Sequence, residues 1–226
     1  MFDNLLNGFY QNFIRDNRYE LIFRGLGNTL LISLLAAFIG IVIGSLLTFC
    51  KLSKYKILRL IANVYIDIIR GTPAFTQLLV FYFVIFGSFS INRLIAAAIA
   101  FGVNSGAYVS EIIRAGILSI DKGQTEAGRS LGFSSGQTMR LIVFPQAIKN
   151  ILPALTNEFI VLIKETSVAG YIGVVDIMKA ANLIQTRTFS YTWTLMGSAV
   201  IYYIIIKILT IIFSNLENHM RKADAR

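Results

Sequence analysis

Residues 25–50 contain no charged side chain, and this run is longer than a helix packed inside a soluble protein needs. About 20 consecutive apolar residues are enough for a helix to cross a bilayer. Charged residues make up 15% of the 226-residue sequence and hydrophobic residues 55%. Because soluble domains carry about 25% charged residues, the sequence predicts an all-α membrane protein surrounded by lipid.

Further apolar segments predict about five transmembrane helices in one domain, residues 21–215. The expected spans are residues 25–50, 57–86, 94–113, 148–165 and 190–213. The fourth span is the weakest of these predictions because it is short and contains Glu158. The flanking parts are an interfacial N-terminal segment, 1–20, and a polar tail, 216–226.

Basic residues are divided unevenly between the two sides of this arrangement. The connections that include residues 119–147 and the tail hold more lysines and arginines than the opposite set. Because such an excess marks the cytoplasmic side, we expect the N-terminus outside and the C-terminus in the cytoplasm. Arg15, Arg18 and Arg24, which precede the first span, favour the opposite orientation. The net charge of +9 is attributed to this topology, and no nucleic-acid partner is expected.

The sequence offers no residue set for catalysis or metal binding. Cys50 is the one cysteine and His219 the one histidine, and they lie at a span end and in the polar tail. A GxxxxGK[ST] phosphate-binding loop is absent, so the chain is not expected to hydrolyse nucleotide by itself. We therefore expect neither an enzyme nor a cofactor or metal site in this chain.

The loop of residues 119–147 carries the signals of two short helices. Capping-box spacing relates Asp121 to Gln124 and Ser134 to Gln137. Gly132 can end the first helix in the left-handed conformation that favours glycine. Such a compact helix pair is suited to docking another protein, and an ordered loop without a partner is the alternative.

Two stretches of this loop resemble the EAA loop of ABC importer permeases. Residues 123–132 read Gly-Gln-Thr-Glu-Ala-Gly-Arg-Ser-Leu-Gly, and residues 140–145 read Arg-Leu-Ile-Val-Phe-Pro. Relative to the family pattern, Gly128 replaces the second alanine and Phe144 replaces a leucine. Further segments are similar to motifs of the polar amino-acid branch of the family: 65–73, 107–114 and 157–167.

The resemblance, which covers about residues 20–215, implies a type I ABC importer permease in a bacterial cytoplasmic membrane. Two permease chains, identical or homologous, would form an alternating-access pathway. Two separate ATPase subunits would bind ATP and Mg²⁺, and an extracytoplasmic solute-binding protein would deliver the amino acid. The ATPases would dock on the coupling loop, whose candidate residues are Gly123, Gln124, Glu126, Ala127, Ser130, Leu131, Gly132 and Pro145.

Polar residues within the second span are candidates for binding the substrate. Asp67 and Arg70 lie three positions apart, on one helical face. They can bind the two charges of a zwitterion, or they can neutralise each other. Pro73 has no N–H to donate to the carbonyl of Ile69, so we expect a free carbonyl in a broken helix of the kind that lines transporter cavities.

Glu158 is expected at mid-membrane depth, with no opposite charge within four positions. An unpaired carboxylate at that depth favours a cation or the ammonium group of an amino acid. We therefore expect a basic amino acid such as arginine, histidine or lysine, with a neutral one such as glutamine second. Asn157 and Asn104 are further candidates. The alternative function is an ion-coupled carrier or channel with Asp67 and Glu158 as cation sites, which would leave the cytoplasmic helix pair unexplained.

Two other patterns concern packing. Small residues recur at every fourth position in the first and third spans, at Ala36, Gly40, Gly44, Gly102 and Gly106. Such stripes let helices approach closely, either within one chain or in a dimer. Residues 167–189 are expected to form an external amphipathic helix with Asp176 on its polar face. That helix would cover the bundle or contact the solute-binding protein.

Overall fold

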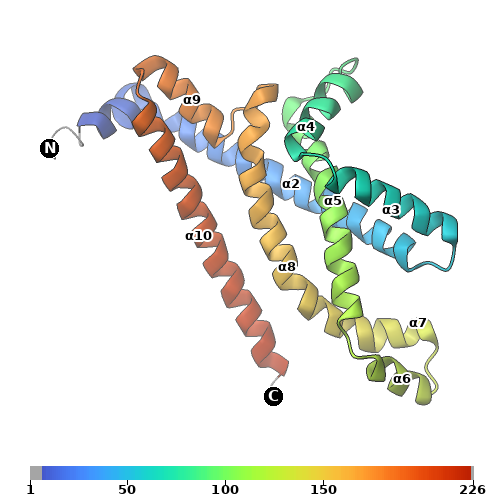
Figure 1. Ribbon diagram of the computed structural model, residues 1–226. Helices are drawn as coiled ribbons and strands as arrows, with labels where there is room; N and C mark the ends of the chain where they lie inside the picture. Colours follow the sequence, from blue (N-terminus) through green and yellow to red (C-terminus); the bar gives the residue numbers. More distant parts are fainter. Residues whose placement is uncertain (1–6, 225–226) are drawn as a thin grey trace.

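The computed structural model describes residues 7–224, and side chains to residue 219, as an all-helical bundle. Its long helices are α2 (Tyr19–Leu52), α5 (Arg93–Leu118), α8 (Phe144–Glu165) and α10 (Tyr191–Asp224). Shorter ones are α3 (Lys56–Arg70), α4 (Ala74–Leu79), α6 (Lys122–Ser130), α7 (Ser135–Thr138) and α9 (Ile177–Thr188). Short 3₁₀ or π-helical segments precede or connect these helices: η1 (Tyr10–Ile14), η2 (Arg15–Asn17), η3 (Val80–Ile85), η4 (Met139–Val143) and η5 (Thr166–Ile172). The all-α prediction is confirmed (Figure 1).

Three of the described helices, α2, α5 and α10, are long and apolar enough to cross a membrane. The α3 helix and the segment from α4 through η3 pass the same test together, although a bend of 103° separates them. The α8 helix does not reach the same apolarity because polar residues such as Lys149, Asn150 and Glu158 lie along it. The count of about five spans therefore stays a prediction.

Helices α2 and α5 pack directly against each other through the two small-residue stripes. A Cβ atom added to Gly106 would lie 2.6 Å from Cγ2 of Ile43, closer than carbon atoms approach without a clash. Gly40 similarly faces Ser105, with 3.0 Å between an added Cβ and the serine hydroxyl. Of the two interpretations of these stripes, packing within one chain describes the contact in this structure.

The bend between α3 and α4 is stabilised differently from the sequence-based prediction. Pro73 precedes α4 as expected, but the carbonyl of Ile69 is not free, and that prediction is wrong. The side-chain amide of Gln77 donates hydrogen bonds to the Ile69 carbonyl and to the Thr72 hydroxyl, each at 2.7 Å. Gln77 in turn accepts a 3.0 Å hydrogen bond from the amide of Asn104. The broken segment is therefore fastened to α5.

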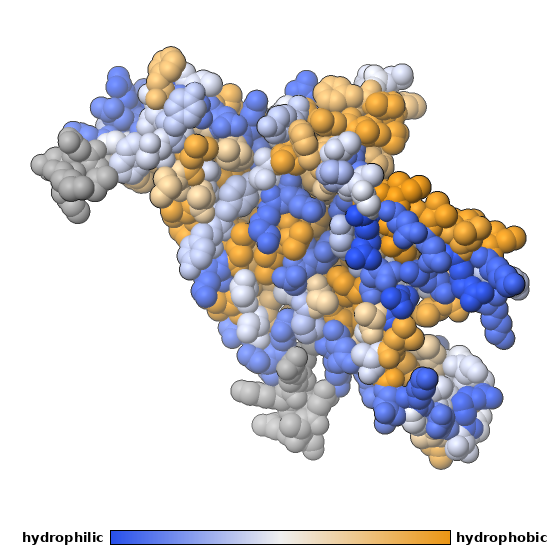
Figure 2. All heavy atoms as spheres, viewed as in Figure 1, coloured by the Kyte–Doolittle hydropathy of each residue, from blue (hydrophilic) through white to orange (hydrophobic). Residues whose placement is uncertain are grey.

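The short helices α6 and α7 lie at one end of the bundle, opposite η1 and α9 (Figure 1). Asp121 caps α6 by accepting from the N–H of Gly123, but Gln124 does not complete a capping box. Ser134 and Gln137 form the predicted capping box of α7. Gly132 has the expected left-handed backbone, with φ of +88°. The surface here is largely hydrophilic, whereas orange hydrophobic side chains follow the outer side of α3 (Figure 2).

Helix α9 is amphipathic and packs on α2 and α10, with Ile177, Ala180, Ala181 and Ile184 buried. Asp176 is fully buried, so its predicted position on a polar face is wrong. Its carboxylate caps α9 by accepting hydrogen bonds of 3.1 Å from two backbone N–H groups, those of Met178 and Lys179. The N-terminal turn η1 packs against α9, and Phe13 within it is buried.

Candidate functional site

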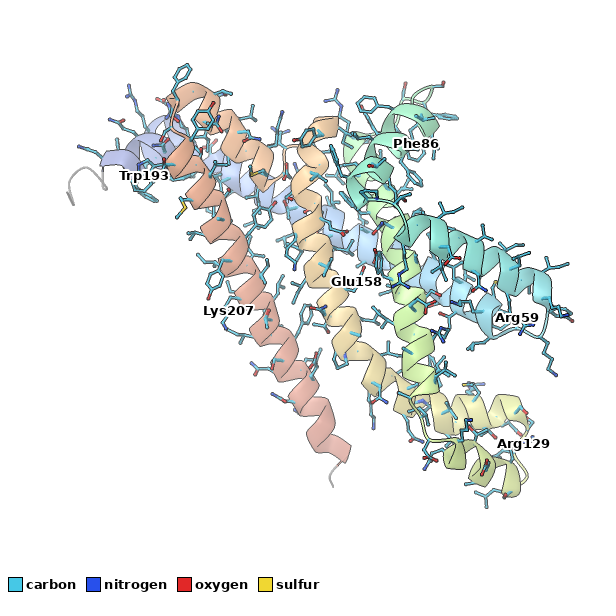
Figure 3. The ribbon with its side chains drawn as sticks, viewed as in Figure 1. Arg59, Phe86, Arg129, Glu158, Trp193 and Lys207 are labelled. Atoms are coloured by element: carbon cyan, nitrogen blue, oxygen red, sulfur yellow. The ribbon has the colours of Figure 1, made fainter. Side chains whose placement is uncertain are left out.

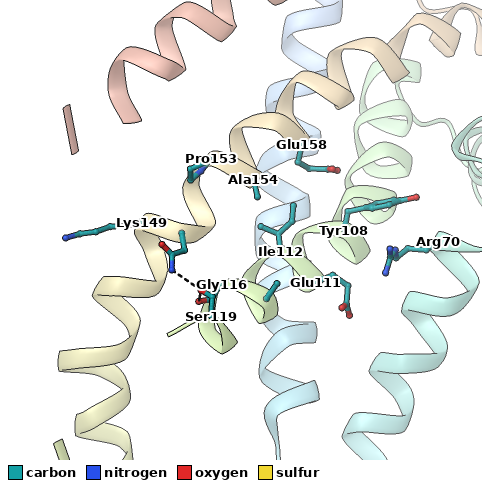
Figure 4. Close-up of a pocket in the computed structure, with 12 residues that line it drawn as sticks. Arg70, Tyr108, Glu111, Ile112, Gly116, Ser119, Lys149, Pro153, Ala154 and Glu158 are labelled. Carbon is teal, nitrogen blue, oxygen red and sulfur yellow. Dashed lines mark hydrogen bonds between the residues drawn. The ribbon is translucent and has the colours of Figure 1, made fainter. Parts of the chain in front are cut away.

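A cavity of about 700 Å³ lies between the end of α3, the second half of α5 and the middle of α8. Figure 4 shows the side chains that line it, among them Arg70 from α3 and Glu158 and Lys149 from α8. The polar lining residues from α5, its C-terminal cap and α8 are Tyr108, Glu111, Ser119, Lys149, Asn150 and Glu158. The volume is within the range of small-molecule sites, about 300–1,000 Å³.

Glu158 is held in this cavity from the neighbouring helix. Its carboxylate accepts a 2.8 Å hydrogen bond from the hydroxyl of Ser105, a fully buried residue of α5. Within residues 7–219 the carboxylate forms no ion pair. Figure 3 shows Glu158 on α8 beside α5. A desolvated carboxylate without a counter-charge is costly at membrane depth. The site therefore favours a ligand with a positively charged group.

Arg70 reaches the same cavity from the end of α3, where its guanidinium lies 5.3 Å from the ring centre of Tyr108. A cation over an aromatic face is attracted by the ring quadrupole, which orients the guanidinium without neutralising it. No ion pair joins Arg70 to Asp67 among the described residues. The self-neutralising pair that the spacing allowed is therefore absent there, and Arg70 remains available for an anion.

Glu111, which also lines the cavity, is already neutralised. It forms an ion pair with Lys51 of α2 and another, at 2.8 Å, with Arg114 one turn along α5. The three side chains are half-buried and join the last turn of α2 to α5. Of the two acids in the cavity, Glu158 is thus the one without an opposite charge beside it in the described structure.

The other predicted site residues lie outside this lining. Asn104 is buried, and its amide is used in the hydrogen bond to Gln77. Asp67 and Asn157 are exposed on α3 and α8 and do not line the cavity. Their part in binding a ligand stays a prediction.

Sequence reasoning missed Ser105 and Tyr108 as contributors to the site. A usable signal was present, because Ser105, Tyr108, Ile112 and Ser119 recur at intervals of three, four and seven along α5. Such spacing places side chains on one helical face. The cavity thereby combines separated positive and negative groups, which suits a zwitterionic ligand. No group of three metal-binding side chains occurs in the part of the chain described here.

Comparison with known proteins gives one consistent family. Residues 21–222 match the family described as "Binding-protein-dependent transport system inner membrane component". The chain is 42% identical over 205 residues to the arginine transport system permease protein ArtQ of Bacillus subtilis, covering 90% of this chain and 94% of that protein. It is 43% identical over 196 residues to the Rickettsia typhi protein named "Putative glutamine transport system permease protein GlnP", covering 85% and 89%.

Solved structures agree with the fold. A crystal structure titled as an amino acid ABC transporter with histidines superposes with a TM-score of 0.84 and 41% identity, covering 89% of this chain and 94% of the other. The methionine transporter MetNI superposes with a TM-score of 0.76 at 20% identity, covering 90% and 98%. At that lower identity the second likeness concerns the fold alone.

Proposed function

The chain belongs to the family of binding-protein-dependent transport system inner membrane components, and we propose that it forms the alternating-access pathway for a polar amino acid. Family membership makes it the permease subunit of an ABC transporter rather than an enzyme. Membership does not favour the ion-coupled carrier or channel, in which Asp67 and Glu158 would bind cations.

The carboxylate of Glu158 in the cavity is the observation that carries this proposal. Its hydrogen bond from Ser105 orients it but leaves its charge unbalanced by any described side chain. The ammonium group of an amino acid supplies the missing positive charge. Arg70, on another wall of the same cavity, can bind the substrate carboxylate through two parallel hydrogen bonds.

A basic amino acid, of the arginine, histidine or lysine type, is the proposed substrate class. Its side chain supplies a second cationic group that can pair with Glu158, whereas Glu111 in the same cavity is already paired with Lys51 and Arg114. Among relatives above 40% identity, one is named for arginine transport and several for glutamine transport. A neutral substrate such as glutamine is therefore the runner-up, because its ammonium group alone can satisfy Glu158.

The helix pair α6–α7 is the proposed docking site for an ATPase subunit. With one such site on each of two permease chains, the assembly would contain two ATPase subunits, which would bind ATP and Mg²⁺. Leu131 at its tip is 75% exposed, and an exposed large apolar side chain beside polar ones suits a protein contact. The other proposed coupling residues are Gly123, Gln124, Glu126, Ala127, Ser130 and Gly132, with Pro145 at the start of α8.

The proposed assembly contains a second permease chain, identical or homologous, and an extracytoplasmic solute-binding protein. We place the chain in a bacterial cytoplasmic membrane with its N-terminus outside and its C-terminus in the cytoplasm. The distribution of basic residues supports this orientation, and so does the separation of η1 and the α6–α7 pair to opposite ends (Figure 1). The solute-binding protein would then meet the end that carries α9.

ATP-dependent uptake tests the proposed substrate site. The chain is reconstituted in liposomes with its ATPase and binding protein, and uptake of labelled arginine and glutamine is compared between wild type and Glu158→Gln. Glutamine retains the size and hydrogen bonding of Glu158 but removes its charge. Because a charge pair in a low-dielectric site contributes a few kcal/mol, arginine uptake should fall at least about tenfold, and by more than glutamine uptake.

Glu20→Gln is the matched control, because it removes one exposed carboxylate from the first turn of α2, away from the cavity. It should leave uptake of both amino acids unchanged. Equal arginine uptake by wild type and a correctly inserted Glu158→Gln variant would remove Glu158 from the pathway. Uptake that persists without ATP would instead contradict an ATP-driven importer.

A further inference from the structure

A second cavity, of about 420 Å³, lies where the N-terminal turns meet the end of α9 and the start of α10. Its lining includes three arginines, Arg15, Arg18 and Arg187, and no acidic side chain. The cavity lies at the end of the bundle opposite the α6–α7 pair (Figure 1). It is therefore separate from the cavity that contains Glu158.

The charge in this second cavity is largely uncompensated within the described residues. Arg18 forms one ion pair, at 2.8 Å, with Asp16, whereas Arg15 and Arg187 form none. Arginine stays protonated at any physiological pH. Two exposed guanidinium groups and one buried group thus converge on a concave surface, and such a cluster attracts anions.

Arg18 and Asn12 show that the cavity is built to receive polar atoms. The side chain of Arg18 is only 10% exposed, and its Nε–H has no acceptor in the described structure. Asn12 is 4% exposed, and its Oδ1 has no donor, although its amide nitrogen donates to the carbonyl of Gly8 at 2.8 Å. A buried donor and a buried acceptor left unpaired are each costly. A ligand suited to both groups offers an acceptor to Arg18 and a donor to Asn12, and a phosphate oxygen and a headgroup hydroxyl meet these two needs.

The residues around the cavity indicate that its ligand is the headgroup of a lipid. Exposed aromatic side chains flank it at Phe9, Tyr10, Phe189 and Tyr191, and aromatic belts mark the level of lipid headgroups. Trp193 lines the cavity at the first turn of the apolar helix α10, beside the N-terminal turns (Figure 3). The guanidinium groups of arginine bind the phosphodiester of such a headgroup through parallel hydrogen bonds.

We propose that this arginine pocket, formed by Arg15, Arg18, Arg187, Asn12 and Trp193, binds the headgroup of an anionic glycerophospholipid such as phosphatidylglycerol. The phosphodiester accepts hydrogen bonds from the guanidinium groups, including the unpaired Nε–H of Arg18. A headgroup hydroxyl donates to the free oxygen of Asn12. The bound lipid fastens the N-terminal segment to the start of α10. This inference is independent of the substrate and of the Glu158 site.

Trp193, the only tryptophan in the chain, provides a direct measurement. The full-length chain in neutral detergent is titrated with phosphatidylglycerol, and tryptophan emission is followed. We expect a saturable change with phosphatidylglycerol and none with phosphatidylcholine. Because a basic residue near a membrane surface strengthens binding of an anionic lipid by a factor of about five, Arg187→Gln and Arg15→Gln should each weaken binding by about that factor.

Arg24→Gln is the matched control, since Arg24 lies near the same end of the bundle but does not line the pocket. It should bind phosphatidylglycerol like the wild type. Unchanged binding in both pocket variants would overturn the proposal. Saturation of the same signal by inorganic phosphate alone would make the pocket a site for free anions, and would overturn the lipid as its source.

A third outcome concerns protein rather than lipid. Normal lipid binding in Arg187→Gln, combined with weaker association of the solute-binding protein, would make the arginines a protein contact and overturn the proposal. Arg15 and Arg187 are exposed, so their replacement is not expected to unfold the chain. Circular dichroism and gel-filtration elution of each variant verify that it is folded.

Discussion

The hydroxyl of Ser105 in α5 donates a 2.8 Å hydrogen bond to the carboxylate of Glu158 in α8. Ser105 is fully buried, and on its other side it meets Gly40 of the tightly packed helix α2. The carboxylate is therefore positioned by the α2–α5 pair rather than by its own helix. Any movement of α8 against that pair changes both the shape of the cavity and the orientation of its unpaired charge.

Ser105→Ala should weaken substrate binding without abolishing transport. A hydrogen bond to a charged group contributes about 1.5–3 kcal/mol. Because Glu158 loses the bond that orients it, the KM for the amino acid should rise about tenfold or more. Uptake in liposomes, measured over a range of substrate concentrations, separates KM from the maximal rate.

Ser33→Ala is the control for this change, because Ser33 is also fully buried but its hydroxyl bonds only to the carbonyl of Thr29 in its own helix. It should leave the KM unchanged. The same rise in KM for both variants would show that loss of any buried serine is responsible, and that Ser105 has no specific role.

Gln77→Leu should disturb the bend between α3 and α4 more than Pro73→Ala does. The leucine leaves the carbonyl of Ile69 and the amide of Asn104 without their partners, and each buried unsatisfied group costs about 1–3 kcal/mol. Pro73→Ala leaves both hydrogen bonds in place. We expect a clearly lower melting temperature for Gln77→Leu and a small shift for Pro73→Ala.

Thermal unfolding of both full-length variants in the same detergent measures this difference. If Pro73→Ala is the more damaging change, the proline rather than the glutamine maintains the bend. Asn104→Leu, which removes the other partner of the same network, should resemble Gln77→Leu in its effect.

Local signals in the sequence predicted much of the fold. The charge-free runs gave α2, α5 and α10, and the capping residues Asp121 and Ser134 gave the starts of α6 and α7. These features depend on neighbours within four residues of one another, so periodicity and capping rules suffice. The packing of Gly106 against α2 was likewise one of two predicted arrangements, because a stripe of small residues permits close approach.

The cavity is formed by contacts between residues distant in sequence, and the side-chain pairs that shape it were therefore not predicted. Glu158 is 53 positions from Ser105, and Gln77 is 27 from Asn104. The prediction of a free carbonyl at Ile69 was wrong for this reason, because the side chain that donates to it, Gln77, lies on the other side of the bend. Asp176 was placed on a polar face because helical periodicity cannot distinguish a solvated acid from a buried helix cap.

Gly132→Ala and Gly136→Ala form a matched pair that tests the helix pair α6–α7. An added Cβ would meet no atom within 4 Å at either position, but only Gly132 has a positive φ, of +88°. A left-handed backbone costs a residue with a Cβ about 1–2 kcal/mol. We expect Gly132→Ala to weaken association with the ATPase and Gly136→Ala, in the helix α7, to leave it unchanged.

Co-purification of each variant with the ATPase measures that association, with membrane insertion as the common reference. Equal recovery of ATPase with both variants would show that the left-handed turn does not set the docking geometry. Loss of ATPase from Gly136→Ala alone would indicate instead that the open surface around α7 forms the contact.

Asp176 should make the stability of the chain depend on pH. Burial raises the pKa of this carboxyl group above its ordinary value, despite the hydrogen bonds that it accepts from the backbone of α9 and from the hydroxyl of Tyr202 at 3.5 Å. Because the folded state holds the proton more tightly than the unfolded state, the contribution to stability is complete below about pH 3.9. It is lost as the pH rises through the raised pKa.

Asp176→Asn isolates this effect, because asparagine caps a helix about as well as aspartate but does not titrate. The melting temperature of the wild type, relative to that of Asp176→Asn, should decline as the pH is raised from 4 toward neutrality. Asp176→Ala, which also removes the cap, should be less stable than Asp176→Asn by about 1 kcal/mol at every pH. A wild type that instead gains stability over Asp176→Asn with rising pH would mean that the cap prefers the charged carboxylate and that burial is not the dominant influence on its pKa.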